Sequence, residues 1–362
     1  MSTDPIVTIV VVARERYSLT ARSLERIYKN TRRPFRLVYV DSGAPAKWRA
    51  YLSRHAAAKG FRLLRCPARA GPNRARNLGL RFVDTKYVVL IDNDVLVSPG
   101  WLEQLVECAE ETNADVVGPL IRQTKVRRDL ATCYHTYLHY SGGDCGVREE
   151  SRGNGVGRHL YKETHNHGRV VRPQHGLTRQ PVRFAEFHCV LVRSAVFAAI
   201  GWLDESIYCE EHVDFCLLVH EAGRTIFFEP GAVVTYVPGP LLEWTDVPVY
   251  LHRWSDAWEL ASYARLREKW DLTESEYFTV RYGRLGFRRR EKVIEPLSRL
   301  MLPNRGGAVL TKILTVLDTA THRAHRSYFF WRRGRSLSTS LPAFEREARV
   351  RSESTTQGGR AR

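Results

Sequence analysis

The sequence lacks the long apolar run that a membrane-spanning helix needs. A span takes roughly 20 consecutive apolar residues, and the longest candidate near the C-terminus, residues 308–317, is interrupted by Thr311, Lys312 and Thr315. The opening residues, MSTDPIVTIVVV, contain no basic stretch and no small-residue cleavage site, and their apolar part has only the length of a strand. We therefore expect neither a signal peptide nor a membrane-spanning helix.

Cysteines are few and do not form a metal-binding or disulfide pattern. The chain has seven cysteines in 362 residues, an odd number, and no CxxC pair. This spacing argues against a disulfide framework and against a structural zinc site. We expect a protein of a reducing, cytoplasmic compartment.

Acidic residues are outnumbered, with 39 against 56 basic residues and a net charge of +17. The excess is uneven, because residues 281–362 hold 19 basic and 6 acidic residues and the rest of the chain is near balance. A basic segment suits an anionic partner such as a phosphorylated ligand, nucleic acid or an acidic membrane surface. No nucleic-acid-binding motif appears, so we expect no specific nucleic acid partner, and a basic nucleic-acid-binding protein is kept as an alternative.

Strand-like and helix-like segments alternate over the first 91 residues. Runs rich in β-branched residues predict strands at 6–12, 36–40, 61–65 and 87–91. The gaps between them predict helices at 19–28, 46–59 and 73–82. Alternation of this kind indicates βαβ units, and so an α/β, Rossmann-like domain with a mostly parallel sheet and flanking helices.

The pattern changes after residue 118. Residues 122–180 are rich in Gly, Arg and His and have little apolar periodicity, which predicts long irregular loops. Apolar periodicity resumes at 184–192, 195–200, 225–228 and 232–237. We predict a catalytic domain over residues 1–240, a helical, aromatic and basic region over 241–337, and a disordered tail over 338–362.

Polar side chains follow the predicted strands where each strand ends. Arg14 and Glu15 follow the first strand, Asp41 the second, and Asp92 and Asp94 the fourth. In an open parallel sheet, ligands bind beyond the carboxyl ends of the strands. Asp41 can accept from a base N–H or a ribose hydroxyl, although a helix cap is its alternative role. Asp94 can hold a hard divalent cation against a diphosphate.

The segment AGPNRARNLGL, residues 70–80, places Arg74, Arg76 and Asn77 at the start of a predicted helix. Guanidinium groups and the N-terminal amides of helices both suit phosphate. Together with the strand-end carboxylates, these residues predict a nucleotide-binding site.

Five blocks, in this order, resemble the family-2 glycosyltransferases with the GT-A fold. They are TIVVVARE, VYVDSG, GPNRARNLGL, LIDNDV and GWLDESIYCEEHVDFCLLVHEAGRTIFFEPGAVV, and they cover the first 240 residues. The resemblance implies a nucleoside-diphosphate sugar donor, Mg²⁺ or Mn²⁺, and inversion at the anomeric carbon. It leaves the acceptor open among glycans, lipid-linked saccharides and small molecules. A nucleotidyltransferase is an alternative, but that class usually has a glycine-rich loop with a lysine after the first strand, and VVVARERYSL has neither.

The resemblance also implies roles for individual residues. The metal ligands would be Asp94 and Asp92, and the acceptor site would include His188, Glu210 and Asp214. The nucleotide-sugar would be bound by Ala13, Arg14, Glu15, Asp41, Arg74, Arg76, Asn77, Asp92 and Asn93. His188 has the alternative of an ordinary buried histidine, and Asp214 that of a structural partner for an arginine.

The third metal ligand departs from the family pattern. Many members have a histidine after the EP strand, where this chain has Tyr236. The third ligand is then absent or comes from elsewhere, with His252 as a weak candidate.

The general base departs from the family pattern as well. Inversion needs a base that takes the proton of the acceptor hydroxyl, and the family uses the second residue of an ED pair. This chain reads CEEHVD: alignment on Asp214 puts Glu211 and His212 in the pair, whereas alignment on paired acids gives Glu210 and Glu211. Glu211 takes part in both alignments and is our first choice. His212 is the alternative, because imidazole can act as a base.

Three further patterns have structural alternatives. The HNHG segment, residues 165–168, has histidines but lacks helical ligand spacing, so it predicts a solvated loop. Trp254 and Trp258 are four residues apart, which predicts one helix face docked on the catalytic domain. The aromatic and basic segment 326–335 suits peripheral contact with the inner face of an anionic membrane, or an ordinary basic surface.

Overall fold

The computed structural model describes residues 4–67, 70–124, 136–152, 155–171, 176–238, 243–302 and 305–332. The tail that we predict to be disordered, from residue 338 onward, lies outside these residues. The chain forms two compact units, Met1–Trp254 and Ser255–Arg362, which are described separately. The domain limits at residues 240 and 337 stay predictions.

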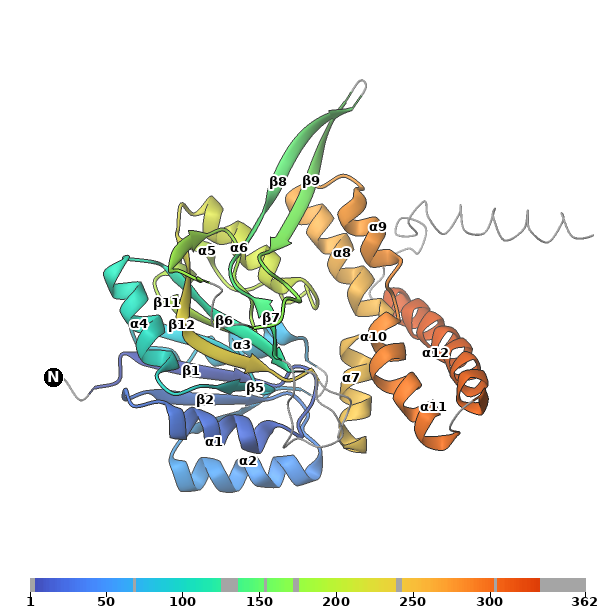
Figure 1. The fold of residues 1–362 in the computed structure, drawn as a ribbon, viewed down its shortest axis with the longest axis horizontal. Coiled ribbons are helices and arrows are strands. Elements are labelled where there is room, and N and C mark those ends of the chain that lie inside the picture. Colours follow the sequence, from blue (N-terminus) through green and yellow to red (C-terminus); the bar gives the residue numbers. More distant parts are fainter. Residues whose placement is uncertain are drawn as a thin grey trace, which may run out of the picture. The chain divides into compact units, whose positions relative to one another are not determined.

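The first unit is built on a mixed sheet whose first half is parallel (Figure 1). Its parallel strands lie in the spatial order β3, β2, β1, β4, with bounds Arg62–Arg65, Arg36–Asp41, Val7–Val12 and Tyr87–Asp92. The sheet continues through β11 (Cys189–Arg193), β6 (Val116–Thr124), β12 (Ile226–Tyr236) and β10 (Gln180–Val182). Two short strands complete it, with β5 (Val95–Val97) on β12 and β7 (Thr136–Tyr140) on β6. The predicted α/β class with a mostly parallel sheet is confirmed.

Helices flank this sheet. They are α1 (Thr20–Asn30), α2 (Ala46–Lys59), α3 (Pro72–Leu80), α4 (Trp101–Glu111), α5 (Val196–Ile200), α6 (Glu211–Glu221) and α7 (Val247–Arg253), the last after a 3₁₀ turn at Trp244–Asp246. The four strands and three helices predicted in the first 91 residues are all present, with ends within two residues of those expected.

The centre of the sheet is apolar on both faces. Every residue of β1 and β4 is buried, which explains why both strands read as continuous apolar runs and not as alternating patterns. Helix α3 lies close against β1, because a Cβ at Gly79 would come within 2.4 Å of a Val10 methyl carbon. Close packing here holds the last turn of α3 against β1.

The predicted irregular region contains a long hairpin. Strands β8 (Gly143–Arg152) and β9 (Gly155–Thr164) pair antiparallel and extend away from the main sheet (Figure 1). The expectation of loops was wrong for these residues. A two-stranded ribbon exposes both faces along its outer part, so no apolar alternation marks it in the sequence, whereas Cys145 and Leu160 near its base are buried.

The second unit is helical, as predicted. Its helices are α8 (Asp256–Trp270), α9 (Glu276–Tyr282), α10 (Phe287–Arg289), a π-helical turn at Arg290–Ile294, α11 (Glu295–Met301) and α12 (Arg305–Arg332). Within this unit the buried Arg289 pairs with Asp256 at 2.8 Å and Asp318 at 2.9 Å, and so joins α8, α10 and α12. No helix among the described residues is long and apolar enough to cross a membrane.

Trp254 and Trp258 do not share a helix face, contrary to expectation. Helix α7 ends at Arg253, and α8 begins at Asp256 after Ser255, whose backbone is extended. An extended serine before the first helical residue starts a new helix and breaks the i, i+4 relation. Both tryptophan side chains are nevertheless buried.

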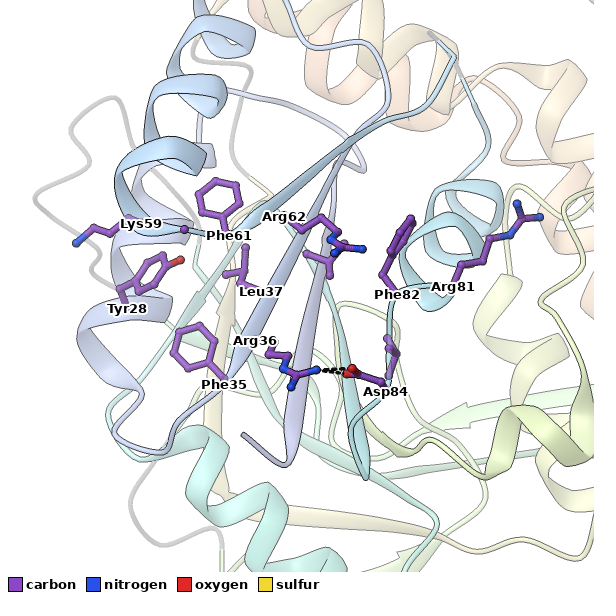
Figure 2. A pocket seen from close by; sticks show the side chains of 13 residues that line it. Tyr28, Phe35, Arg36, Leu37, Lys59, Phe61, Arg62, Arg81, Phe82 and Asp84 are labelled. Carbon is purple, nitrogen blue, oxygen red and sulfur yellow. Dashed lines mark hydrogen bonds and ion pairs between the residues drawn. The ribbon is translucent and has the colours of Figure 1, made fainter. Parts of the chain in front are cut away.

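The amino-terminal ends of β2 and β3 border an open groove of about 550 Å³ (Figure 2). Its walls combine aromatic rings with basic side chains: Tyr28, Phe35, Phe61 and Phe82 with Arg36, Lys59, Arg62 and Arg81. Because β2 runs from Arg36 to Asp41, this groove lies at the opposite end of the strands from the predicted site.

Candidate functional site

The predicted site residues of four segments meet at the carboxyl ends of the strands. Val12, the last residue of β1, is opposite both Val40 of β2 and Asp92 of β4. The antiparallel strand β11 pairs with β4, and the carbonyl of His188 accepts the backbone N–H of Asp92 at 3.1 Å. The loops after β1, β2 and β4 therefore lie beside the segment that leads into β11.

Asp92 is held by two arginines and a histidine. Its Oδ2 accepts from Arg14 at 3.0 Å, its Oδ1 accepts from Arg76 at 3.1 Å, and His188 Nδ1 lies 3.2 Å from Oδ2. Burial by itself would raise the pKa of this fully buried carboxyl, but Arg14, the His188 hydrogen bond and Arg76 hold it below its ordinary value. Asp92 is therefore an ionised anchor for this edge of the sheet.

Asp94 is equally buried but has no such partners. Both of its carboxylate oxygens lack a hydrogen bond from any described residue. Burial raises the pKa of Asp94 well above its ordinary value, and the nearby Glu15 and Asp92 raise it further. A buried carboxylate without donors is costly unless a cation neutralises it, so these oxygens fit a divalent cation.

His188 supplies an imidazole beside this carboxylate pair. Ligand atoms of Asp92, Asp94 and His188 all lie within 4.8 Å of one another. The His188 ring stacks on Tyr236, with 4.0 Å between ring centroids, and the Tyr236 hydroxyl donates to Glu15 at 3.0 Å. Two carboxylates and an imidazole are ligands that Mn²⁺ accepts readily, and Mg²⁺ favours the oxygens among them.

A second group of ligand-type side chains shares His188. Ligand atoms of His139 and Glu186 also lie within 4.8 Å of one another and of His188. Sequence reasoning missed both residues, because β7 and the segment before β11 are separated by about 50 positions and neither has a metal-binding spacing. His252, the weak candidate from the sequence, is in neither group of described ligand-type side chains.

Asp41 and Asn93 organise the loops around the site. Asp41 Oδ1 accepts the backbone N–H groups of Gly43 at 3.0 Å and Ala44 at 2.6 Å, so it holds the turn after β2. Asn93 donates to the carbonyl of Arg16 at 2.7 Å and thereby orders the loop after β1. That loop begins at the buried Ala13.

The three predicted phosphate-binding residues of α3 have different surroundings. The Arg74 side chain is 55% exposed and lies 4.0 Å from Glu205. Arg76 is fully buried among carboxylates. Asn77 donates to the carbonyl of Leu203 at 2.8 Å and accepts its N–H at 3.1 Å, which ties α3 to the GWLDES block. Of these three, Arg74 has the solvent access that a ligand needs.

Glu211 is enclosed by two arginines. Its Oε1 accepts from Arg76 at 3.4 Å and from Arg253 at 3.3 Å, and the residue is 1% exposed. Burial alone would raise the pKa of the Glu211 carboxyl, but Arg253, Arg14 and Arg76 lower it below its ordinary value. Arg253 lies 42 residues further along the chain in α7, and no sequence signal marked it.

His212 has different neighbours. Its Nε2 lies 2.8 Å from the ammonium group of Lys162, which comes from the β9 strand of the hairpin. Lys162 also pairs with Glu210 at 3.4 Å and Glu186 at 3.6 Å. Burial lowers the pKa of His212 to about 4, Glu186 and Glu210 oppose that shift, and Lys162 adds to it. The ring is therefore neutral at physiological pH.

The start of α6 combines this charge cluster with an unusual backbone. Glu210 precedes the helix and has φ 58°, a left-handed conformation that non-glycine residues seldom adopt. Strain of this kind concentrates at functional sites, where surrounding contacts maintain it. Asp214, one turn into the helix, is buried.

The HNHG segment forms a turn, as predicted. His165 Nε2 lies 3.0 Å from Asp144, and His167 Nδ1 donates to the carbonyl of His139 at 2.9 Å. Both imidazoles thus have protein partners.

Comparison with known proteins agrees with this geometry. Residues 8–196 match the model of glycosyl transferase family 2. The chain belongs to glycosyl transferase family 2. The match ends before the GWLDES block, so the family roles assigned to Glu210, Glu211, His212 and Asp214 stay predictions.

Two curated relatives of this family-2 chain are the pre-mycofactocin glycosyltransferases of two Mycobacterium tuberculosis strains. Each is 27% identical over 232 residues, which cover 64% of this chain and 42% of the relative. The chain thus spans less than half the length of these relatives. Among solved structures, GalNAc-T7 with UDP, GalNAc and Mn²⁺ aligns with a TM-score of 0.50 at 15% identity, over 77% of this chain and 54% of that chain. This likeness concerns the fold, which is GT-A.

Proposed function

We propose that this chain is a metal-dependent, inverting glycosyltransferase that moves a sugar from a nucleoside-diphosphate sugar to an acceptor hydroxyl. The observation that carries the proposal is Asp94, a fully buried carboxylate at a strand end whose two oxygens have no donor among the described residues. A divalent cation would satisfy both oxygens, and a diphosphate is a natural further ligand for such a cation. Family membership favours this function over a nucleotidyltransferase or a nucleic-acid-binding protein.

The donor would lie along the carboxyl ends of β1, β2 and β4. Asp41 already orders its own turn with Oδ1, and its carboxylate would accept from the base or ribose at the same place. Arg74 is the exposed cation at the start of α3 and would meet phosphate. Arg76 and Asn77 have protein partners, and we assign them to positioning the site.

The cation would be held by Asp94 and His188, with Asp92 next to them. When bound, it would stabilise the negative charge that develops on the departing nucleoside diphosphate. Tyr236, which stands where many family members have histidine, would act through its ring: it stacks on His188 and keeps that imidazole beside the carboxylates. The third ligand would thus come from His188, directly before β11.

His212 is the better placed of the two candidate bases. Oε1 of Glu211 is already occupied by Arg76 and Arg253. The neutral His212 ring has one lone pair, at Nε2, which Lys162 contacts. An acceptor hydroxyl that takes the place of the Lys162 ammonium would meet this lone pair. This assignment reverses our first choice from the sequence.

The reaction balances as a single displacement. The acceptor oxygen forms a bond to the anomeric carbon while its proton passes to His212 Nε2. The bond from the anomeric carbon to the diphosphate oxygen breaks, and the diphosphate leaves with that electron pair on the opposite face. One inversion of configuration follows.

A screen of nucleoside-diphosphate sugars tests this proposal. Thermal unfolding is followed with each donor in the presence of Mn²⁺, Mg²⁺ or EDTA, and the expected result is stabilisation by one donor only when a cation is present. Asp94→Asn should abolish that stabilisation, whereas Asp84→Asn at the other end of the sheet should preserve it. No stabilisation by any donor with either metal would contradict the proposal. Transfer is then assayed with several acceptors. Pre-mycofactocin is one of them, because the curated relatives are named as pre-mycofactocin glycosyltransferases.

A further inference from the structure

Helix α12 of the second unit has an unusually apolar outer face. Val309, Ile313, Val316 and Leu317 are 60%, 52%, 68% and 57% exposed, although they are among the most apolar residues of the chain. Exposed apolar side chains are common singly, whereas a contiguous group of them usually marks an interaction site.

These residues form one stripe. They are followed by Ala320, Ala324, Tyr328 and Trp331, all exposed, so the spacing from residue 309 onward is 4, 7, 8, 11, 15, 19 and 22 positions. At 3.6 residues per turn, these positions fall on one side of the helix. The stripe is about 33 Å long, from a rise of 1.5 Å per residue.

The opposite face of α12 is already used inside the second unit. Asp318 pairs with the buried Arg289, and His322, one turn further along, is buried at 8% exposure. Helix α11 packs on α12 near its start, where a Cβ at Gly307 would come within 2.4 Å of the Leu302 carbonyl oxygen. These contacts fix the rotation of α12 and leave the stripe outward.

The charged residues of α12 that border the stripe are basic. Lys312 and Arg323 are exposed along one edge of it. At the end of α11, Arg299 is 77% exposed and pairs with Glu295 at 3.5 Å, and it is followed by the exposed Leu300 and Met301. Asp318 is the only acidic residue of α12, and it is neutralised by Arg289 on the packed face.

We propose that this stripe, Val309 to Trp331 of α12, binds the surface of an anionic phospholipid bilayer and lies in the plane of its headgroups. An apolar face bordered by lysine and arginine is what an interfacial helix presents, with aromatic rings at the headgroup level. The attachment is peripheral, and it brings the glycosyltransferase to the membrane independently of the donor site.

Two other occupants fit the surface less well. A second copy of the chain would bring Lys312 and Arg323 of one stripe close to the cations of the other, and the outer face has no acidic residues to offset that repulsion. Nucleic acid would need cations along the middle of the surface, where this stripe is apolar.

Sedimentation of the full chain with vesicles tests the proposal. One set contains phosphatidylcholine alone, and the other contains phosphatidylcholine mixed with phosphatidylglycerol, which gives the vesicle surface a negative potential. We expect binding to the anionic vesicles, weakened but not abolished by salt, because the apolar contribution is not screened. The double change Ile313→Glu and Leu317→Glu should reduce binding about tenfold or more, since it puts charge into the headgroup region.

The matched control is Val156→Glu. Val156, in the β9 strand of the first unit, is 63% exposed and apolar but lies outside the stripe, so its replacement should leave vesicle binding unchanged. Circular dichroism and metal-dependent donor binding of every variant report folding and the catalytic site separately from attachment. The proposal fails if the double variant binds as well as the wild type, or if both vesicle compositions bind equally. It also fails if the wild type is a dimer by light scattering that the double change dissociates, because a second copy then covers the stripe.

Discussion

The ion pairs at the two ends of the parallel strands differ in their exposure to solvent. At the carboxyl ends, the Arg76–Asp92 ion pair is fully buried and Arg76 also contacts Glu211. At the amino ends, Arg36 of β2 pairs with Asp84, and their side chains are 52% and 66% exposed (Figure 2). An arginine–aspartate pair is therefore buried at the carboxyl ends of the strands and exposed to solvent at their amino ends.

The burial of the first pair therefore needs a reason other than stability. Burying an ion pair costs more desolvation free energy than its attraction returns in many proteins, so a buried network is weak evidence for stability. The attraction within an exposed pair is screened by solvent, so the pair changes the free energy of unfolding little. At the carboxyl ends, protein partners hold the buried charges in place, as the proposed binding of a charged donor would require.

The largest expected effect is on Asp94. Asp94→Asn should reduce transfer by about a thousandfold or more, because it removes the cation's carboxylate ligand. The free energy of unfolding should stay equal or rise, since a buried carboxylate without donors is removed. Turnover is measured at saturating donor with Mn²⁺, and stability by urea unfolding without metal. Wild-type turnover in this variant would refute the metal site.

Replacing the two arginines should have very different costs in stability. Arg76→Met should destabilise the first unit by about 3–5 kcal/mol, because Asp92 and Glu211 would remain buried without their partner. Arg36→Met at the other end of the strands should cost less than about 1 kcal/mol. Both values come from urea unfolding under identical conditions. Equal costs for the two arginines would mean that burial does not distinguish the two edges.

Two further variants separate the candidate bases. His212→Asn should lower kcat by about a hundredfold or more while donor affinity is unchanged, as expected for loss of a general base. Glu211→Gln should mainly lower stability, since it weakens the contacts to Arg76 and Arg253. Donor affinity is measured by calorimetry, apart from turnover. Loss of kcat in Glu211→Gln alone would restore our first choice from the sequence.

The smallest effect is a shift in pH dependence. With a pKa of about 4, His212 is neutral above that pH, so activity should persist to about pH 5 for either base, and pH alone does not separate them. Lys162 lowers this pKa, so Lys162→Met should raise it and move the acid limb of kcat to higher pH. Lys269→Met, in the second unit, is the control and should leave the limb in place. An unmoved limb in Lys162→Met would remove His212 as the base.

The same shift affects stability. Unfolded histidine binds its proton near about pH 6.5, whereas folded His212 does so only near pH 4. The unfolded state therefore binds more protons between these values, and the free energy of unfolding falls as the pH is lowered through this window. Lys162→Met should make that loss smaller, because the folded pKa moves toward the unfolded one.

The sequence alone determined the first half of the sheet and the position of its strand-end carboxylates. Apolar runs such as residues 87–91 are local, and they predict buried strands wherever the chain places them. Asp92 and Asp94 follow directly, so their location at a strand end needed no tertiary information. The β8–β9 hairpin, by contrast, has polar residues on both faces, and local pattern could not reveal it.

The contacts between charged side chains depend on the tertiary fold. Strand β11 lies antiparallel beside β4, and this pairing alone brings His188 to Asp92 across 96 positions of sequence. The same holds for Arg253 with Glu211 and Lys162 with His212, which are 42 and 50 positions apart. Side-chain pairing at such separations depends on strand order and helix packing, which residue type and spacing do not encode. The sequence therefore located the candidate site, and the fold determines which of its side chains meet.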